Sequence, residues 1–320
     1  MSSYTDINGF SALAHYGLIK VGGEDASGFL QGQLTCDVNA LTPGGSCLGA
    51  QCNPKGRVIA NFHLLRGERD FYLLLAADLA PVARKRLQMY VLRSKVALDD
   101  LTPGRAMIGL FGTGYASGLA ALGIDIPDSP GAVLERPGCL VFRLADGTGR
   151  CLIAADVELA QRMESSLRGA LALADPNLWR LAGIEAGIPE ITAAASEEFL
   201  PQMLNLDALG GIGFQKGCYT GQEIVTRTHF LGQLKRRMFR LRCRSETEPA
   251  PGTLIYDAGE AEPRNVGQVV AAAAEVPGGY QLLAVMGVDH DLGGDYRLLR
   301  PDGPKTEFLP LPYTCGGHSL

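Results

Sequence analysis

The chain has 320 residues, of which 46% are hydrophobic and 20% are charged, as in an ordinary globular protein. Its length exceeds what one compact core usually accommodates, so two or three domains are favoured. The formal net charge of −5 excludes a surface that attracts nucleic acid over its whole extent.

The sequence shows no sign of export, membrane insertion or metal binding. Its apolar runs are far shorter than a membrane span, and no basic stretch with an apolar core opens the chain. We therefore expect a cytoplasmic protein with no membrane segment, in which most of the eight cysteines stay reduced. Cys36, Cys47 and Cys52 match no standard zinc spacing, so no metal site is expected.

The region before residue 175 contains two copies of one pattern. Residues 62–66 and 71–75 predict a hairpin, and a helical run follows it directly. Residues 139–144 and 151–153 predict a second hairpin that is again followed by a helix. One β-β-α unit cannot bury its helix face alone, so we expect the two units to pack together. The alternative is coincidence between two common units.

A helix is predicted to start at Asp175-Pro176, because aspartate is a favoured N-cap and proline a favoured first helical residue. Trp179, the only tryptophan of the chain, lies one turn into this helix, and Glu185 follows on the same helix. The simplest interpretation makes Trp179 a core anchor and Glu185 an exposed helix residue.

Residues 216–223, KGCYTGQE, carry one cysteine between glycine-rich positions. Thr220 and Glu223 have the spacing of a capping box, which predicts a helix start here. Cys218 would then lie at the positive end of a helix dipole with Lys216 nearby, and both effects favour a thiolate. The pattern predicts a functional thiol at Cys218. A structural cysteine in a glycine-rich turn is the alternative.

The last part of the chain, from about Lys235, is predicted to be β-structure. Phe239, Leu241 and Cys243 alternate with arginines, as expected for a strand with one buried face. The short spacing of these strands, with proline and glycine between them, predicts a small β-barrel. The expected strands are residues 238–244, 254–256, 266–271, 281–288 and 296–299.

The octapeptide resembles the signature of the YgfZ family, bacterial folate-binding proteins related to the T-protein (aminomethyltransferase) of the glycine cleavage system. Matches in the same order along nearly the whole chain are more specific than any single motif. They cover residues 29–38, 53–57, 184–189, 201–237, 267–269 and 309–313.

The resemblance implies an α+β fold with two related, ferredoxin-like or T-protein-like α+β domains and a C-terminal β-barrel around a central folate-binding channel. The α+β region is expected to cover residues 1–234, as two pseudo-repeated units of roughly 1–100 and 101–234 that can interleave. The barrel is expected to cover residues 235–320.

The implied function is the binding of tetrahydrofolate or a derivative, with Cys218 as the functional thiol and Lys216 beside it. The family is associated with the assembly or repair of iron–sulfur enzymes, so the implied partners are iron–sulfur proteins such as tRNA-thiolating enzymes. Direct nucleic-acid binding is not expected, because the sequence has no base-reading module.

One dense basic run has three open interpretations. It is a solvated barrel face, a site for the anionic polyglutamate tail of a folate, or an RNA contact. The run consists of Lys235, Arg236, Arg237, Arg240, Arg242 and Arg244.

The resemblance also implies which residues hold the folate. Trp179 and Tyr16 take the positions of two aromatic residues of the folate site, where a flat ring stacks on a pterin or p-aminobenzoyl group. At position 16 the family often has tryptophan, and this chain has tyrosine. Glu185 takes the position of the glutamate that accepts hydrogen bonds from the aminopyrimidine edge.

Asn61 occupies the position where T-proteins carry an aspartate implicated in aminomethyl transfer. A neutral amide cannot act as a general base or stabilise a developing cation as a carboxylate does. Folate binding at this position is compatible with asparagine, and aminomethyl transfer is not. A tetrahydrofolate-dependent aminomethyltransferase or other one-carbon transferase is therefore the alternative function, which Asn61 disfavours.

Overall fold

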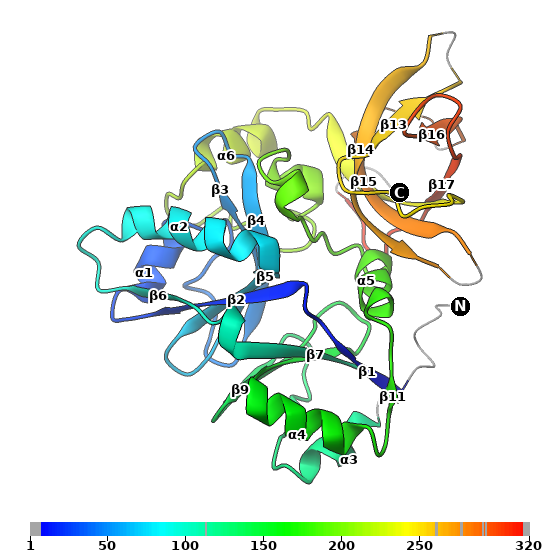
Figure 1. Cartoon of the computed structure of the whole chain (residues 1–320). Helices are drawn as coiled ribbons and strands as arrows, with labels where there is room; N and C mark the ends of the chain where they lie inside the picture. Colours follow the sequence, from blue (N-terminus) through cyan, green and yellow to red (C-terminus); the bar gives the residue numbers. More distant parts are fainter. Residues whose placement is uncertain are drawn as a thin grey trace.

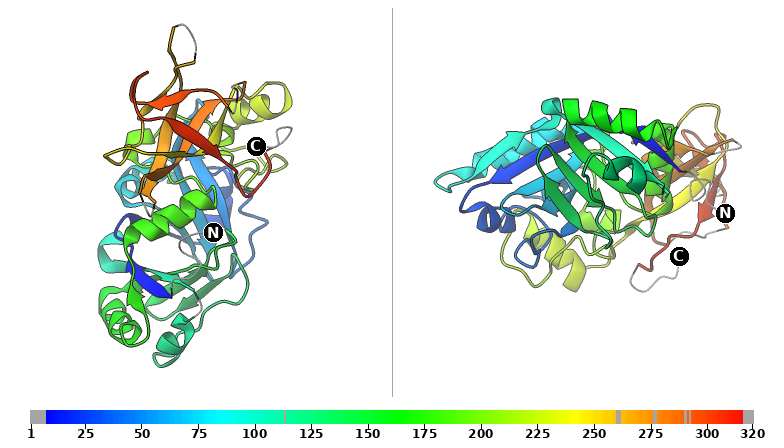
Figure 2. Two further views of the ribbon diagram at one scale, coloured as in Figure 1. Left: turned by 90° about the vertical axis from the view of Figure 1, so that its right-hand side faces the viewer. Right: turned by 90° about the horizontal axis from the view of Figure 1, so that it is seen from below.

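The computed structural model describes residues 8–112, 114–259, 262–275, 278–289, 291 and 293–315. These residues form a mixed α+β fold with three sheets, two of which pack face to face while the third stands at one end of the molecule (Figure 1). Helix α5 lies next to the third sheet, as the second view also shows (Figure 2).

The first unit contains a five-stranded antiparallel sheet in the order β3-β4-β5-β2-β6. Its elements are β2 (Tyr16–Gly22), α1 (Ala26–Gln31), β3 (Ser46–Cys52), β4 (Val58–Arg66), β5 (Phe71–Ala76), η1 (Ala77–Leu79), α2 (Ala80–Val91) and β6 (Ala97–Asp100).

The second unit repeats this plan with one addition. Its sheet has the order β8-β9-β10-β7-β1-β11, in which β1 from the start of the chain lies between β7 and β11. The two β-β-α units predicted from the sequence are confirmed, and each is part of a longer β-α-β-β-β-α-β repeat. The elements are β1 (Gly9–Ala12), η2 (Thr102–Gly104), β7 (Arg105–Phe111), α3 (Tyr115–Ala120), β8 (Val133–Arg136), β9 (Cys139–Arg143), β10 (Cys151–Asp156), α4 (Val157–Leu167) and β11 (Ala172–Leu173).

Both units bury both faces of their sheets. Successive strand residues point to opposite faces, so alternate residues of β5 and β10 enter different cores. On β5, Leu73 packs in the core under α2, whereas Leu74 faces the second unit. On β10, Ile153 packs under α4, whereas Leu152 faces the first unit. The two sheets therefore share one core between them, which is why these strands are apolar along their length.

The third sheet is antiparallel in the order β16-β13-β14-β15-β12-β17, and it curls into a half-barrel. An isolated bridge joins Arg297 of β16 to Lys305, just before β17. All five expected strands are present, and β17 was not anticipated. The strands are β12 (Arg236–Cys243), β13 (Leu254–Asp257), β14 (Arg264–Ala274), β15 (Tyr280–Gly287), β16 (Tyr296–Leu298) and β17 (Thr306–Leu309).

Helix α5 (Pro176–Glu185) joins the second unit to the third sheet. The Asp175 side chain accepts a hydrogen bond from the Asn177 N–H, which confirms the predicted N-cap and the proline that follows it. The Asn177 side chain in turn pairs with both backbone groups of Ala274 at the end of β14. The helices and turns after it are η3 (Ala193–Ala195), η4 (Pro201–Leu204) and α6 (Gln222–Phe230).

No helix in the described part of the chain has both the length and the apolar character that a membrane crossing requires.

The close packing of Trp179 on β7 generates a stability prediction. A Cβ atom at Gly109 would lie 2.5 Å from Trp179 Cε3 and 2.8 Å from Leu13 Cδ1. Gly109→Ala should therefore destabilise the protein by about 1–3 kcal/mol, as overpacked cores do. Urea unfolding monitored by circular dichroism measures this change.

The matched control is Gly28→Ala on the exposed side of α1, where a Cβ would meet no atom within 4 Å. Here the loss of backbone entropy in the unfolded chain should stabilise the protein by about 0.5–1 kcal/mol. Equal unfolding midpoints for the two variants would contradict the tight packing described at β7.

Candidate functional site

A cavity of about 330 Å³ lies between α5, the segment that follows α5, and β14 of the third sheet. We call it the central cavity, and Tyr16, Trp179, Gly183 and Glu190 are among its lining residues. A smaller cavity of about 30 Å³ shares Tyr16, Gly183, Ile188 and Glu190 with it, and extends between the two units toward β4. The two cavities adjoin at these shared residues.

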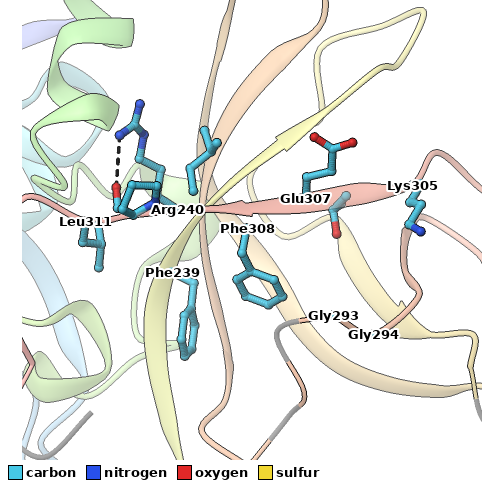
Figure 3. Close-up of a pocket in the computed structure, with 11 residues that line it drawn as sticks. Phe239, Arg240, Gly293, Gly294, Lys305, Glu307, Phe308 and Leu311 are labelled. Carbon is cyan, nitrogen blue, oxygen red and sulfur yellow. Dashed lines mark hydrogen bonds between the residues drawn. The ribbon is translucent and has the colours of Figure 1, made fainter. Parts of the chain in front are cut away.

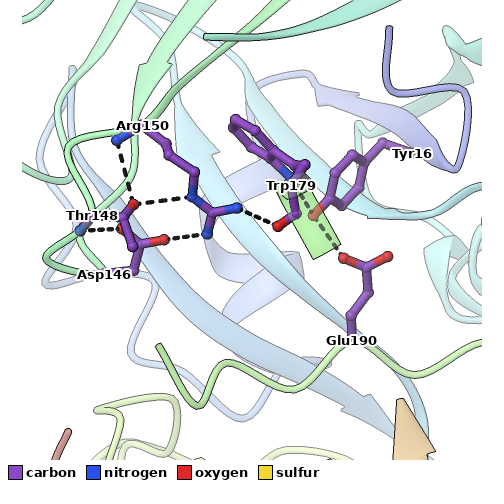
Figure 4. A network of polar contacts seen from close by, with 6 residues as sticks. All are labelled: Tyr16, Asp146, Thr148, Arg150, Trp179 and Glu190. Atoms are coloured by element: carbon purple, nitrogen blue, oxygen red, sulfur yellow. Dashed lines mark hydrogen bonds and ion pairs between the residues drawn. The ribbon is translucent and has the colours of Figure 1, made fainter. Parts of the chain in front are cut away.

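A chain of hydrogen bonds crosses the wall of the central cavity (Figure 4). The indole Nε1 of Trp179 donates to the Tyr16 hydroxyl at 3.2 Å, and that hydroxyl donates to Glu190 Oε2 at 2.6 Å. Burial, followed by the negative charge of Glu190, raises the pKa of Tyr16 well above its ordinary value. Tyr16 therefore stays protonated and keeps its hydrogen directed at the carboxylate.

His15 lies beside this chain, with Nε2 3.9 Å from Glu190 Oε1. Burial lowers the pKa of His15, and the nearby Glu190 offsets this only in part. The ring is therefore neutral at pH 7, since an ordinary histidine pKa is already about 6.5.

Trp179 is held from several sides. Its side chain is 1% exposed and packs edge to face with Phe111 at 5.6 Å. The buried Arg150 guanidinium lies 4.3 Å above the ring, donates to the Trp179 carbonyl, and forms an ion pair with the equally buried Asp146. Trp179 is thus a core anchor that also contributes a small part of the cavity wall.

Asn61 on β4 lines the small cavity, but backbone groups engage both ends of its amide. Its Nδ2 donates to the Pro189 carbonyl at 2.6 Å, and its Oδ1 accepts from the Ile191 N–H at 2.9 Å. The side chain is 6% exposed. Asn61 therefore holds the segment that carries Glu190 against the first unit.

Glu185 points away from this site, toward the third sheet. Its Oε1 accepts a hydrogen bond from Gln281 Nε2 at 3.1 Å and lies 3.7 Å from Arg240 Nη2. Glu185 does not line the central or the small cavity. Its expected contact with a pterin stays a prediction, which requires the side chain to leave these partners.

The sequence analysis missed Glu190, His15 and the Asp146–Arg150 pair. For Glu190 a signal existed, because a charged residue interrupts the apolar stretch Gly187 to Ile191. For Arg150 and Asp146 no local signal existed, since they lie in a turn-rich segment where charged residues are common.

The loop that carries Cys218 forms a second region of interest, where three of the sequence motifs meet. The Thr220 N–H donates to the Gly32 carbonyl at 3.3 Å. Gly221 has a φ of +83°, and a Cβ there would lie 2.5 Å from the Asn53 carbonyl oxygen and 3.0 Å from Gly56. Only glycine fits this position without strain, which explains the second glycine of the octapeptide.

The helix start differs from the prediction. Helix α6 begins at Gln222 with Gly221 as N-cap, and no side chain caps it. The predicted capping box is wrong, because the Thr220 hydroxyl donates to Gln33 Oε1 instead. Lys216 Nζ donates to the carbonyls of Leu34 and Cys36 at 2.8 and 2.6 Å and so anchors the loop. Burial lowers the pKa of this lysine.

Cys218 is the exposed member of the eight cysteines, all of which are free. Burial raises the pKa of most of the others, for example that of Cys243 to about 11. Cys47 is the exception, because its neighbour Cys36 lowers the pKa of the Cys47 thiol. Exposure therefore makes Cys218 the most accessible thiol, and Cys47 is its nearest competitor in reactivity.

An exposed aromatic patch lies beside the Cys218 loop, at the end of α6. Phe214 stacks on His229 with ring centroids 3.7 Å apart, and Phe230 packs edge to face against both rings. Phe230 and Leu231 are 63% and 86% exposed. Phe214 precedes Cys218 by four residues, so the patch begins within roughly 14 Å of that residue.

Half of the basic run is engaged within the protein. Arg237 forms a two-point ion pair with Asp207, and Arg242 forms another with Glu275. Arg240 donates to Gln281 Oε1. The remaining members are exposed, and they are Lys235, Arg236 and Arg244.

A third cavity, of about 520 Å³, lies on the third sheet against β12, β17 and the glycines before β16 (Figure 3). Phe239, Phe308 and Lys305 are among its lining residues, and Arg240 donates across it to the Pro310 carbonyl at 3.1 Å. It shares no lining residue with the central cavity. Among the residues that the structure describes, no three His, Cys, Asp or Glu side chains gather as a metal site.

Comparisons with known proteins define the class. The fold matches the glycine cleavage system aminomethyltransferase T of Bartonella henselae with a TM-score of 0.76 and 19% identity, over 97% of this chain and 87% of that one. The protein therefore has the T-protein fold. No family model matches the chain.

A curated relative gives the family. Over 305 residues the chain is 33% identical to the tRNA-modifying protein YgfZ of Klebsiella pneumoniae (strain 342). The matched region covers 94% of this chain and 92% of the relative. The chain belongs to the YgfZ family.

The two hydrogen bonds of the Asn61 amide, to Pro189 and from Ile191, form a clamp on the Glu190 segment, and this clamp generates a prediction. Asn61→Asp should destabilise the protein by about 1–3 kcal/mol, because the buried Pro189 carbonyl loses its donor and faces a carboxylate. The carboxyl of the introduced aspartate would have a raised pKa in the folded state. The loss of unfolding free energy should therefore grow as the pH rises toward 7. Urea unfolding at pH 5 and pH 7.5 tests both statements.

Asn39→Asp is the control, because Asn39 is exposed and its Oδ1 only accepts a hydrogen bond from the Ser27 hydroxyl. A carboxylate keeps that acceptor, so the stability should change by less than about 0.5 kcal/mol. An Asn61→Asp variant as stable as this control at pH 7.5 would show that the clamp does not hold the Glu190 segment.

Proposed function

We propose that the protein binds a reduced folate, tetrahydrofolate or a derivative, in the central cavity. The observation that carries this proposal is the central cavity, which lies where both units meet the third sheet. Two aromatic side chains and one carboxylate, linked by hydrogen bonds, line it: Tyr16, Trp179 and Glu190. Its volume of about 330 Å³ lies in the range of small-molecule sites.

The cavity chemistry suits a flat, polar heterocycle. Ile188 and Val270 supply apolar walls, Tyr16 supplies a ring, and Glu190 supplies a hydrogen-bond acceptor. Arg180 lines the same cavity and forms an ion pair with Glu248 at 2.7 Å. This exposed cation is a candidate contact for the carboxylate groups of a folate tail. Tyr16, Asn61 and Trp179 stay proposed folate-site residues, whereas Glu185, the fourth residue that the resemblance implies, lines neither cavity.

We further propose that Cys218 is the functional thiol and that the protein supports iron–sulfur enzymes that modify tRNA. The family membership and the name of the relative, a tRNA-modifying protein, support the connection to tRNA modification. The exposed thiol and the adjoining aromatic patch support a protein partner, because exposed apolar clusters commonly mark interaction surfaces. Lys216 is proposed to position the loop through its two backbone contacts.

Strand β4 connects the two regions. The turn before it, at Asn53 and Gly56, supports the Cys218 loop, and Asn61 further along lines the small cavity. Five residues of extended chain from Gly56 to Asn61 span roughly 17 Å. We propose that residues 1–234 form the folate-binding part, as two interleaved units, and that residues 235–320 close into a barrel beside it.

Aminomethyl transfer is the alternative function, and the match of the fold to that of an aminomethyltransferase favours it. Asn61 argues against it, because the amide is neutral and both of its polar ends are engaged by backbone groups. Tetrahydrofolate-dependent release of ammonia from an aminomethyl-lipoyl carrier distinguishes the two functions.

Binding of a reduced folate should quench the fluorescence of Trp179, since it is the only tryptophan and lines the cavity. Titration with 5-formyltetrahydrofolate, corrected for ligand absorbance with free tryptophan, measures this effect. Calorimetry on Trp179→Phe, which lacks the fluorescent signal, provides an independent affinity. Absence of binding by both methods would refute the folate proposal.

Cys218→Ser should keep the fold and most of the folate affinity but abolish function, because a hydroxyl is a poor nucleophile and a poor soft-metal ligand. Complementation of a strain without its own family member, read out as thiolated tRNA nucleosides, should fall to the level of the empty vector. Cys47→Ser is the control and should complement fully. Full complementation by a stably expressed Cys218→Ser variant would exclude a chemical role for this thiol.

A further inference from the structure

Asp78, Asp146 and Glu248 also line the cavities, where they accept hydrogen bonds from the Ala193 N–H, Arg150 and Arg180, respectively, and Glu190 is the fourth carboxylate there. It lines both the central and the small cavity, and its side chain is 32% exposed. Asn61 holds the backbone on either side of it, through Pro189 and Ile191. The position of Glu190 is therefore set by the first unit, although it lies directly after α5.

The hydrogen-bond directions around Glu190 follow from chemistry. An indole N–H can only donate, so the Tyr16 oxygen accepts from Trp179 and the Tyr16 hydrogen points at Glu190 Oε2. Within the described part of the chain, no hydrogen bond reaches Oε1, and His15 Nε2 stays 3.9 Å away. Oε1 is therefore the acceptor that remains for a ligand.

Glu185, in contrast, is engaged at the third sheet. Gln281, which is 1% exposed, donates to it and also to Glu275, and Arg240 stands 3.7 Å away. Moving Glu185 into the central cavity would break the hydrogen bond from the buried Gln281 and the contact with Arg240, which costs free energy.

We propose that Glu190, rather than Glu185, accepts hydrogen bonds from the N–H donor edge of the bound heterocycle. The inference rests on the proposed folate function and assigns its recognition residue. An ionised carboxylate has no donor, so Glu190 favours ligands that present adjacent N–H groups, such as an aminopyrimidine, over ligands that present carbonyl oxygens. Tyr16 is a positioning residue, because its hydroxyl fixes the carboxylate.

The test is calorimetric titration of the full chain with 5-formyltetrahydrofolate. Glu190→Gln keeps an oxygen for the Tyr16 hydroxyl but turns the other acceptor into a donor. The affinity should fall by about 10- to 100-fold, as for the loss of a charged hydrogen bond. Glu185→Gln is the matched control and should change the affinity less than threefold. Thermal unfolding of both variants checks that they fold.

A second ligand, the same folate without its 2-amino group, makes the test independent of folding defects. The unaltered protein and Glu185→Gln should both bind it at least tenfold more weakly than the parent folate, and Glu190→Gln should no longer discriminate. Loss of discrimination in Glu185→Gln, or its persistence in a folded Glu190→Gln, would overturn the assignment while the folate function stands. No binding of either ligand to the unaltered protein would overturn both.

Discussion

The burial of Trp179 is the interaction on which the architecture depends. Its ring lies on Gly109 of β7, under the guanidinium of Arg150 and against Phe111, so it completes the core between the two units. Its helix also pairs with β14 through Asn177. One side chain and one short helix thus hold both units and the third sheet together, and the central cavity lies at this junction.

Two polar clusters surround the same residue, with different consequences. The Asp146–Arg150 ion pair is almost fully buried, and such a pair is costly to break because it leaves an uncompensated charge. It fixes the position of Trp179. The Tyr16–Glu190 pair lies at the cavity wall and keeps one carboxylate oxygen for a ligand. A preorganised binding site needs rigid support for its lining residues and an acceptor that is available to the ligand. The buried ion pair provides the first, and Glu190 provides the second.

The sequence allowed much of the fold to be predicted, because the signals were local. Hairpins followed by helices identified the repeated units, and alternation identified the strands of the third sheet. Strand β17 was missed because it is a four-residue edge strand. The capping box at Thr220 failed for a tertiary reason, since its hydroxyl found a partner at Gln33, far away in sequence.

Sequence by itself determined the family, because motif order and residue type carry that information, and it singled out Cys218, Trp179 and Asn61 as candidate site residues. Only the tertiary structure decided which of the two glutamates, Glu185 or Glu190, lines the cavity. Glu185 and Glu190 are five residues apart, but α5 ends between them, so one is directed to the third sheet and the other to Tyr16. Their partners come from β15 and β2, distant strands that no local pattern connects to either glutamate.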